Sequence, residues 1–276
     1  MAKLVVAETF APRLTQLQHT LPQSILIHGP LGSGLGTIAR SLGDTSSLVI
    51  EPLTTKGDID HEQGTISVER IRQLYEQTRS VRRKRLVVII DDAERMSSGA
   101  QNAFLKLLEE PTAATHFILT SHHPSRLLPT VRSRVQQYFV APISETQSRG
   151  ITLSYRTLSD TQRTQALFVA NGRAALLHRL CANPEQLATF AAVMSDARTY
   201  LTAPSRYQRL CTALRYVSSR QMALEFVDAS LTITGYMLTT HPSSDLAIQS
   251  ERLLQLRKQL TQNANPRLQL INSVVQ

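Results

Sequence analysis

A glycine-rich segment at residues 29–36, GPLGSGLG, is the first part of the chain whose residue types and spacing could bind a ligand. It follows an apolar run and precedes a helix-like segment, as phosphate-binding P-loops do. In the working motif GxxxxGK[ST], glycine amides cradle phosphates, a lysine reaches the outer phosphates and a hydroxyl holds magnesium. The corresponding positions here are Gly29, Pro30, Leu31, Gly32, Ser33, Gly34, Leu35 and Gly36.

The two residues that carry the chemistry of a P-loop are replaced. Leu35 stands at the lysine position and Gly36 at the hydroxyl position, while Thr37 falls one residue too late. Loss of one charge-assisted hydrogen bond costs about 1.5–3 kcal/mol, roughly a tenfold to hundredfold weakening. The sequence therefore predicts a degenerate nucleotide loop that keeps its shape. A glycine-rich turn unrelated to nucleotides and a shifted register that uses Thr37 are the alternatives.

An acidic pair, Asp91 and Asp92, follows the apolar run RLVVII. In ATPases the first acid after such a strand holds magnesium, and a following glutamate activates the attacking water. Asp92 takes the place of that glutamate with a side chain one methylene shorter. Taken alone, two acids after a strand favour a helix cap over a metal site. Together with the upstream loop, they indicate a Walker B-like element.

Strand-like and helix-like segments alternate over residues 1–143, which predicts an α/β fold with a parallel sheet covered on both faces. The predicted strands are 24–29, 85–91, 116–121 and 135–140, and the predicted helices are 37–43, 68–78 and 97–110. The continuous apolar run at 85–91 is typical of a strand buried on both faces. Ser97 is a candidate N-cap, and Pro111 is expected to stop the helix at 97–110.

The chain from about residue 144 onward has helical periodicity only, with turn signals at Asn183-Pro184, Ala203-Pro204 and His241-Pro242. We predict one small helical domain to about 190 and a second from 191 to 276. Cys181 and Cys211, both in helix-like segments, form no spaced framework, so we expect reduced thiols in a cytoplasm.

The net charge of +9 is tilted toward the C-terminal part. Residues 1–144 carry 16 Lys and Arg against 13 Asp and Glu, and residues 145–276 carry 14 against 8. Such an excess favours nucleic acid or an acidic protein surface as a partner. No run of 18 uncharged apolar residues occurs, and the first residues do not resemble a secretory signal, so we expect no membrane partner.

Residues 88–134 resemble the bacterial clamp-loader family of AAA+ ATPases. The pieces DDAERM, AQNAFLKLLEEP, FILTS and LLPTVRSR stand in the order and spacing of that family. The degenerate loop lies at the proper distance upstream, and the tail at 263–275, NANPRLQLINSVV, is similar to the closing helix of the family's collar domain. The resemblance implies an AAA+ ATPase-like domain at 1–143, a helical lid at 144–190 and a helical collar for oligomerisation at 191–276.

The same resemblance implies roles for several side chains. Ser133-Arg134 falls on the family's Ser-Arg pair, whose arginine acts in trans as a finger at a neighbouring ATPase site. Val135 replaces the cysteine that usually follows. A surface arginine without a finger role is the alternative for Arg134. For the helix at 97–110 the resemblance implies communication between subunits, and a plain helix with solvated charges is the alternative. The communication residues would be Asn102, Lys106, Glu109 and Glu110.

Other features depart from the ATP-binding members of the family. The nucleotide-sensing arginine of the lid falls on Ala175, with neighbouring Arg173 leaving the register open. The family's four-cysteine zinc module is missing, since residues 46–66 contain no cysteine, so we predict no zinc. His61 and the nearby acids could suggest a metal site, but we interpret them as a solvated loop. A basic run has two interpretations, a solvated loop or a contact with DNA or an acidic partner. It comprises Arg79, Arg82, Arg83, Lys84 and Arg85.

The function that the resemblance implies is that of a non-hydrolysing loader subunit, which binds ATP weakly or not at all and helps to place a sliding clamp on primed DNA. Its partners would be the ATPase motor and clamp-opening subunits of a DNA polymerase III assembly, with clamp and DNA reached through that assembly. An active motor subunit, a DNA-binding adaptor on the same fold and the clamp-opening subunit itself are the alternatives. Leu35 and Gly36 argue against the motor, and the Ser-Arg pair argues against the clamp-opening subunit.

Overall fold

A computed structural model describes residues 4–44, 46–61, 63–80, 85–110, 114–262 and 264–275. The chain divides into two compact units. The first comprises residues 1–156 and 170–179, and the second comprises residues 157–169 and 180–276.

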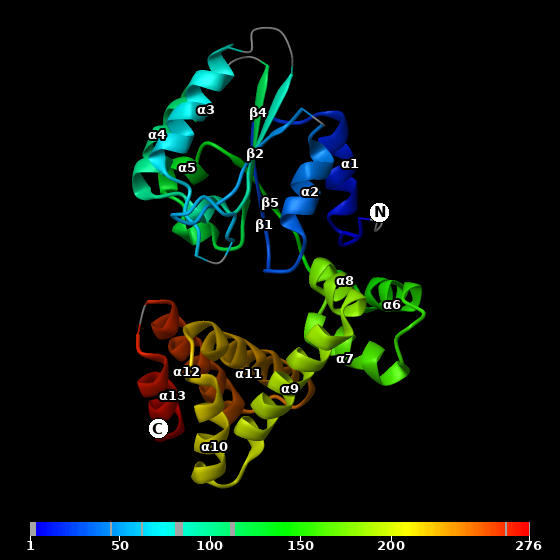
Figure 1. Cartoon of the computed structure of the whole chain (residues 1–276). Coiled ribbons are helices and arrows are strands. Elements are labelled where there is room, and N and C mark those ends of the chain that lie inside the picture. Colours follow the sequence, from blue (N-terminus) through cyan, green and yellow to red (C-terminus); the bar gives the residue numbers. More distant parts are fainter. Residues whose placement is uncertain are drawn as a thin grey trace. The chain divides into compact units, whose positions relative to one another are not determined.

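The first unit is built on a parallel sheet (Figure 1), whose strands are hydrogen-bonded in the order β2-β3-β4-β1-β5. Because the connected strands are parallel, their carboxyl ends share one edge, which is where ligands bind in open α/β sheets. The strands are β1 (Ser24–His28), β2 (Leu48–Ile50), β3 (Leu86–Ile90), β4 (Thr115–Ser121) and β5 (Gln136–Phe139).

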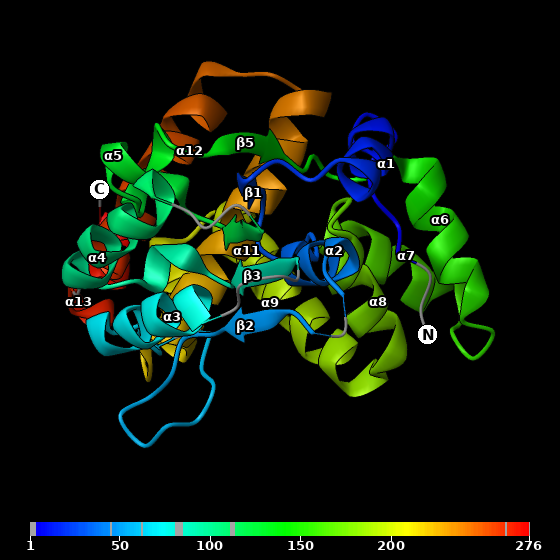
Figure 2. The same cartoon turned by 90° about the horizontal axis from the view of Figure 1, so that it is seen from above.

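Helices cover both faces of this sheet, seen edge-on in Figure 2. Alternate residues of β3 enter opposite cores, Val87 and Ile89 on one face and Val88 and Ile90 on the other. Helices α1 (Ala11–His19) and α2 (Leu35–Leu42) pack on the first face. The second face is covered by α3 (Val68–Ser80), α4 (Ser98–Glu109) and α5 (Pro129–Arg132). Short 3-10 turns lie at Ala93–Arg95 and Pro124–Arg126.

The parallel α/β sheet and most predicted elements are confirmed, and every residue of β3 is buried as predicted. Ser97 caps α4 by accepting a hydrogen bond from the backbone amide of Ala100. Pro111 lies outside the described residues. The interpretation of 46–66 as a loop is wrong for Leu48–Ile50, which form the edge strand β2. Three residues are too few to give a periodic pattern, and only their pairing with β3 makes them a strand.

The helices that follow the sheet are α6 (Glu145–Ser154), α7 (Asp160–Ala170) and α8 (Ala174–Ala182). Ser144 forms a capping box with Gln147 at the start of α6. By its contacts α6 belongs to the first unit, as do residues 174–179 of α8, whereas residues 160–169 of α7 belong to the second. The division into a lid at 144–190 and a collar from 191 stays a prediction.

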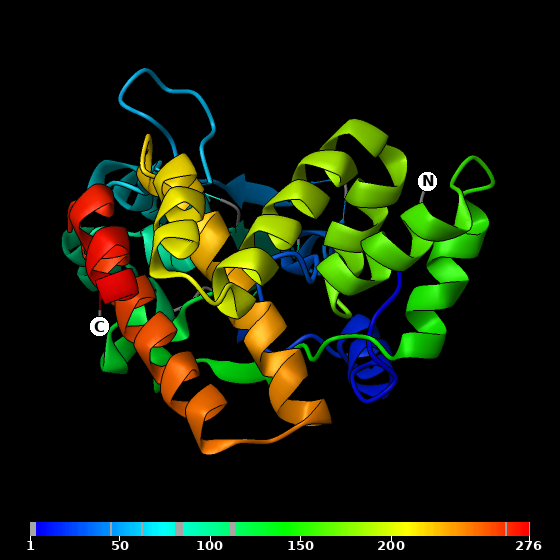
Figure 3. The same cartoon turned by 90° about the horizontal axis from the view of Figure 1, so that it is seen from below.

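The described residues of the second unit form helices joined by turns and loops, with no strand among them (Figure 3). Its core includes Phe226, which stacks on Tyr216 and meets Tyr200 edge-on. Its remaining helices are α9 (Pro184–Thr202), α10 (Arg206–Ala213), α11 (Arg220–Thr240), α12 (Ser244–Thr261) and α13 (Pro266–Val275), with a 3-10 turn at Leu214–Tyr216. Among the described residues, no helix has both the length and the apolar character that crossing a bilayer requires.

The predicted turn signals mark real helix ends in this region. Asn183 caps α9, whose first residue is Pro184, and Ala203 and His241 end α9 and α11. Cys181 and Cys211 are free thiols, the first buried and the second exposed.

Candidate functional site

The glycine-rich loop lies between β1 and α2, at the carboxyl edge of the sheet. Gly32 and Gly34 have φ angles of 89° and 87°, a left-handed conformation that side-chain-bearing residues avoid. Leu35, the first residue of α2, is 1% exposed and belongs to the core beneath the loop, whereas Leu31 is 70% exposed. The residue at the lysine position thus packs into the protein and presents no polar group to the loop.

The first turn of α8 packs directly on this loop. The backbone amide of Leu176 donates a 3.0 Å hydrogen bond to the carbonyl of Gly32. A Cβ atom added at Gly32 would lie 2.9 Å from the Cβ of Leu176, and one at Gly34 would lie 3.2 Å from the Cβ of Ala175. Ala175, the residue expected in place of the lid arginine, therefore faces the loop. The Nε of neighbouring Arg173 donates to the carbonyl of Ala170.

Asp91 is buried, and both of its carboxylate oxygens accept hydrogen bonds from other side chains. Thr120 Oγ1 donates to Oδ1 at 2.6 Å, and Arg40 Nη2 lies 3.1 Å from Oδ2. The same Arg40 nitrogen lies 2.6 Å from Glu51 Oε1. A permanently charged guanidinium therefore lies between two carboxylates beside the Walker B-like strand.

Gly36 lies against this ion-pair cluster. A Cβ atom at Gly36 would lie 2.7 Å from both Asp91 Oδ2 and Arg40 Nη1. In a P-loop this position carries the hydroxyl that holds magnesium. Here the neighbouring space is taken by the Arg40 side chain, which supplies positive charge to Asp91 from within the chain.

Asp92, the second acid, has a left-handed backbone with φ of 50° and is also buried. Its Oδ2 lies 2.7 Å from His61 Nδ1, and its Oδ1 lies 3.7 Å from His122 Nε2. Burial raises the pKa of the Asp92 carboxyl above its ordinary value, and the hydrogen bond with His61 opposes that shift. His61, interpreted from the sequence as part of a solvated loop, is thus a partner of the acidic pair.

Ser133 and Arg134 are exposed and lie between α5 and β5. Arg134 Nη2 pairs with Glu109 Oε1 of α4 at 2.8 Å, and Arg134 Nη1 donates to the carbonyl of Thr130. The fold therefore joins two residues to which separate roles were assigned, the candidate finger and a candidate communication residue. Val135 is buried in the core next to them.

The other candidate communication residues lie along α4 or at its end. Asn102, Lys106 and Glu109 are exposed, and their spacing places them on one helix face. Glu110 is the C-cap. Residues 82–84 of the basic run at 79–85 lie outside the described residues. Among the residues that are described, no group of three or more His, Cys, Asp or Glu side chains could hold a metal ion.

Comparison with known proteins identifies relatives of part of this chain. The family model described as "DNA polymerase III, delta subunit" matches residues 44–144. DNA polymerase III subunit delta' of Escherichia coli is 36% identical over 111 residues, which cover 38% of this chain and 33% of the relative. The same subunit of Pseudomonas aeruginosa is 55% identical over 53 residues, 19% of this chain and 16% of the relative. Residues 44–144 belong to the clamp-loader family.

More distant matches are consistent with the clamp-loader assignment. The replication factor C small subunit of Staphylothermus marinus is 27% identical over 147 residues, 52% of this chain and 44% of the relative. A solved DNA polymerase III gamma subunit-related protein from Thermotoga maritima shares the fold. Its TM-score is 0.54 at 19% identity, over 95% of this chain and 97% of that one. The matches to the delta' relatives span a third or less of their length.

Several residues around the loop and the acidic pair could not be singled out from the sequence. Arg40 lies on α2, and Glu51 directly follows β2; Glu51 and Asp91 become neighbours because Ile50 pairs with Ile90. Glu51 could have been predicted as a site residue because an acid directly follows a strand, but β2 is too short to be recognised from the sequence. Thr120, which also accepts from the amide of Asp92, lies inside the predicted strand at 116–121 and resembles an ordinary strand residue.

The contact between α8 and the loop predicts a stability effect at Gly32. Alanine there should lower the free energy of unfolding by about 2–4 kcal/mol, since it combines a left-handed φ with a clash against Leu176. Gly57→Ala is the matched control, because Gly57 has φ of 90° but no atom within 4 Å of an added Cβ. Its cost should be about 1–2 kcal/mol. Urea denaturation measures both, and equal losses in the two variants would contradict the contact.

Proposed function

We propose that this chain is a non-hydrolysing clamp-loader subunit that assists ATP turnover at a neighbouring subunit without binding Mg-ATP itself. The observation that carries the proposal is the engagement of Asp91 by Arg40 and Thr120 beside a loop that lacks lysine and hydroxyl. The family membership of residues 44–144 supplies the loader context. Its role would be like that of the delta' subunits to which it is similar.

Three independent features argue against a bound Mg-ATP at the loop. Leu35 offers no cation to the phosphates and is directed into the core. Both oxygens of Asp91 are already hydrogen-bonded to protein groups. Ala175 and Leu176 lie against the glycines that would have to surround the phosphates. The residues present do not fit Mg-ATP, and we propose that their packing instead makes this unit a rigid element of the loader.

The proposed contribution to catalysis is the guanidinium of Arg134. Its exposure allows it to reach a neighbouring chain, and a planar, permanent charge suits a transferred phosphoryl group. To act in trans it must leave Glu109. Both side chains are partly exposed, at 38% and 49%, and such pairs contribute about 0–1 kcal/mol. The ion pair can therefore hold the side chain in place between encounters and still release it.

The partners that follow from this proposal are the ATPase motor and clamp-opening subunits of a cytoplasmic DNA polymerase III loader. Sliding clamp and primed DNA would be reached through the assembly. The exposed face of α4, with Asn102 and Lys106, would transmit the state of the neighbouring ATPase site to this chain. The helices from residue 191 onward would form its part of a collar.

Calorimetric titration of the isolated chain with Mg-ATP tests the proposal directly. We expect no saturable heat up to about 1 mM nucleotide and no phosphate release. The charge-assisted hydrogen bond of the lysine, worth about 1.5–3 kcal/mol, and the hydroxyl that holds magnesium are both missing. An Asp91→Asn variant should give the same flat trace. Saturable binding or turnover that disappears in Asp91→Asn would refute the proposed function.

A further inference from the structure

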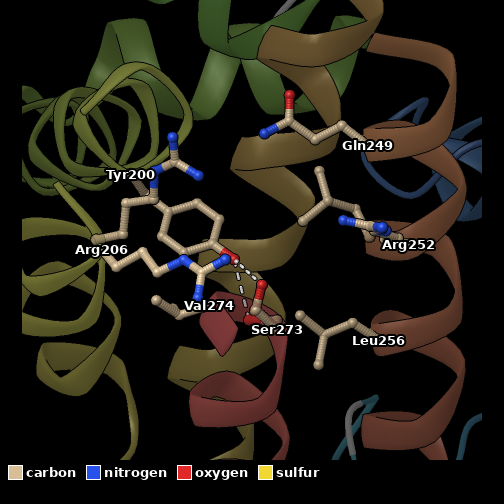
Figure 4. Close-up of a pocket in the computed structure, with 9 residues that line it drawn as sticks. Tyr200, Arg206, Gln249, Arg252, Leu256, Ser273 and Val274 are labelled. Carbon is tan, nitrogen blue, oxygen red and sulfur yellow. Dashed lines mark hydrogen bonds between the residues drawn. The ribbon is translucent and has the colours of Figure 1, made fainter. Parts of the chain in front are cut away.

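A cavity of about 130 Å³ lies in the second unit, among α9, α10, α12 and α13. Figure 4 shows its lining side chains. Three of them are arginines, Arg206 and Arg209 of α10 and Arg252 of α12, and Gln249 adds an amide. The cavity is therefore lined by groups that donate hydrogen bonds and carry positive charge.

The positions of two lining groups are fixed by hydrogen bonds within the unit. The Tyr200 hydroxyl lies 3.0 Å from Ser273 Oγ, which ties α9 to α13 (Figure 4). Arg209 Nε donates to the carbonyl of Ala203 at 2.8 Å, so the plane of its guanidinium is set by the end of α9. Tyr200 and Arg209 are therefore held in place within the unit, whereas Arg206 and Arg252 are exposed at its surface.

The charge of the lining side chains indicates the charge of the ligand. Within the described part of the chain, the lining contains three guanidinium groups and no carboxylate. Arginine guanidinium groups bind carboxylate and phosphate through two parallel hydrogen bonds, which gives geometry as well as energy. An anion with at least two acceptor oxygens is therefore the ligand that this cavity fits.

The size of the cavity limits that anion to a single group. Pockets for whole small molecules enclose about 300–1,000 Å³, and a water molecule occupies about 30 Å³ of liquid. A volume of about 130 Å³ is too small for a nucleotide and sufficient for one carboxylate or phosphate with a little water. The cavity therefore admits one such group, either free or carried by a larger molecule.

The apolar part of the lining favours a peptide over a nucleic acid. Leu253 and Leu256 of α12 and Val274 of α13 are buried and line the same cavity. A nucleic acid strand presents a row of phosphates and binds to open basic surfaces. An acidic side chain next to an aliphatic residue instead offers one recessed charge and apolar surface together. We propose that this pocket binds an acidic, leucine-containing peptide segment of a partner protein through Arg206 and Arg252.

Fluorescence anisotropy on the full chain tests the proposal with a labelled peptide, Gly-Glu-Leu-Glu-Leu-Gly, at low salt. We expect saturable binding that Arg206→Ala and Arg252→Ala each weaken by about tenfold or more, as loss of a charge-assisted hydrogen bond requires. A control peptide with Gln in place of each Glu should bind at least about tenfold more weakly, because it cannot form the charge-assisted hydrogen bonds. Arg209 is left unchanged because it also supports the backbone of α9.

Arg220→Ala is the matched control. Arg220 is the exposed first residue of α11, as Arg206 is of α10, and it does not line the cavity. Arg220→Ala should change peptide affinity by less than about twofold, since it removes one positive charge of the same kind away from the cavity. No saturable binding of the acidic peptide up to 1 mM, about the weakest affinity such an assay resolves, would overturn the proposal. So would equal weakening by Arg220→Ala, or a twelve-nucleotide oligothymidylate that displaces the peptide from these arginines at lower concentration.

Discussion

Replacing Arg134 with alanine should lower ATP turnover in a reconstituted loader, at the site to which this chain is adjacent, by about a thousandfold or more. An arginine finger supplied in trans contributes about 10³–10⁵ to the rate of phosphoryl transfer, because it meets charge that develops only in the transition state. The loss should therefore fall on the rate constant and leave ATP affinity nearly unchanged. Single-turnover phosphate release measures the affected site separately from the others.

Three variants separate the proposed finger from its structural surroundings. Arg126→Ala removes an exposed arginine from the turn before α5 and should leave turnover unchanged. Arg134→Lys keeps the charge but loses the two-pronged geometry, so it should recover only part of the rate. Glu109→Gln breaks the ion pair and keeps the finger. If Glu109→Gln slowed turnover as much as Arg134→Ala, the residue would act through its contact with α4, and the finger role would be wrong.

The sequence predicted those parts of the molecule whose signals are local. Residues 86–90 within the predicted strand at 85–91 are all apolar, and such a run is typical of a strand covered on both faces. Ser97, Pro184 and the X-Pro steps in the second half set helix ends through their own backbone chemistry. The glycine frame of the loop could also be read directly, because positive φ at Gly32 and Gly34 is a property of single residues.

The contacts that define the site depend on pairing between distant segments. Arg40 and Asp91 are 51 residues apart, and nothing in the local sequence of α2 marks one arginine as the partner of a buried acid. His61 reaches Asp92 across 31 residues, from a segment whose composition is that of an exposed loop. The sequence shows which P-loop side chains are missing from the loop. It does not show that Arg40 and the start of α8 occupy the space beside the loop.

Because the packing around the loop cannot be read from the sequence, the substitution Leu35→Lys should have a result that the motif alone does not predict. In a sequence alignment this change restores the lysine of a P-loop. In the fold it places an ammonium group in the core beneath the loop, where Leu35 is 1% exposed. An uncompensated buried charge costs about 3–5 kcal/mol. We expect the free energy of unfolding in urea to fall by about 3 kcal/mol or more, a large part of the 5–15 kcal/mol typical of a domain.

Leu31→Lys is the matched control for this prediction, since Leu31 belongs to the same loop and is 70% exposed. That variant should stay within about 0.5 kcal/mol of the unmodified chain. The contrast separates the burial of a charge from the mere addition of a lysine to the loop. If Leu35→Lys were as stable as Leu31→Lys and gained saturable Mg-ATP binding, the lysine would have turned out of the core toward phosphates. Nucleotide binding would then require only the lysine and not the hydroxyl missing at Gly36, and the packing of Arg40, Ala175 and Leu176 around the loop would not exclude a nucleotide.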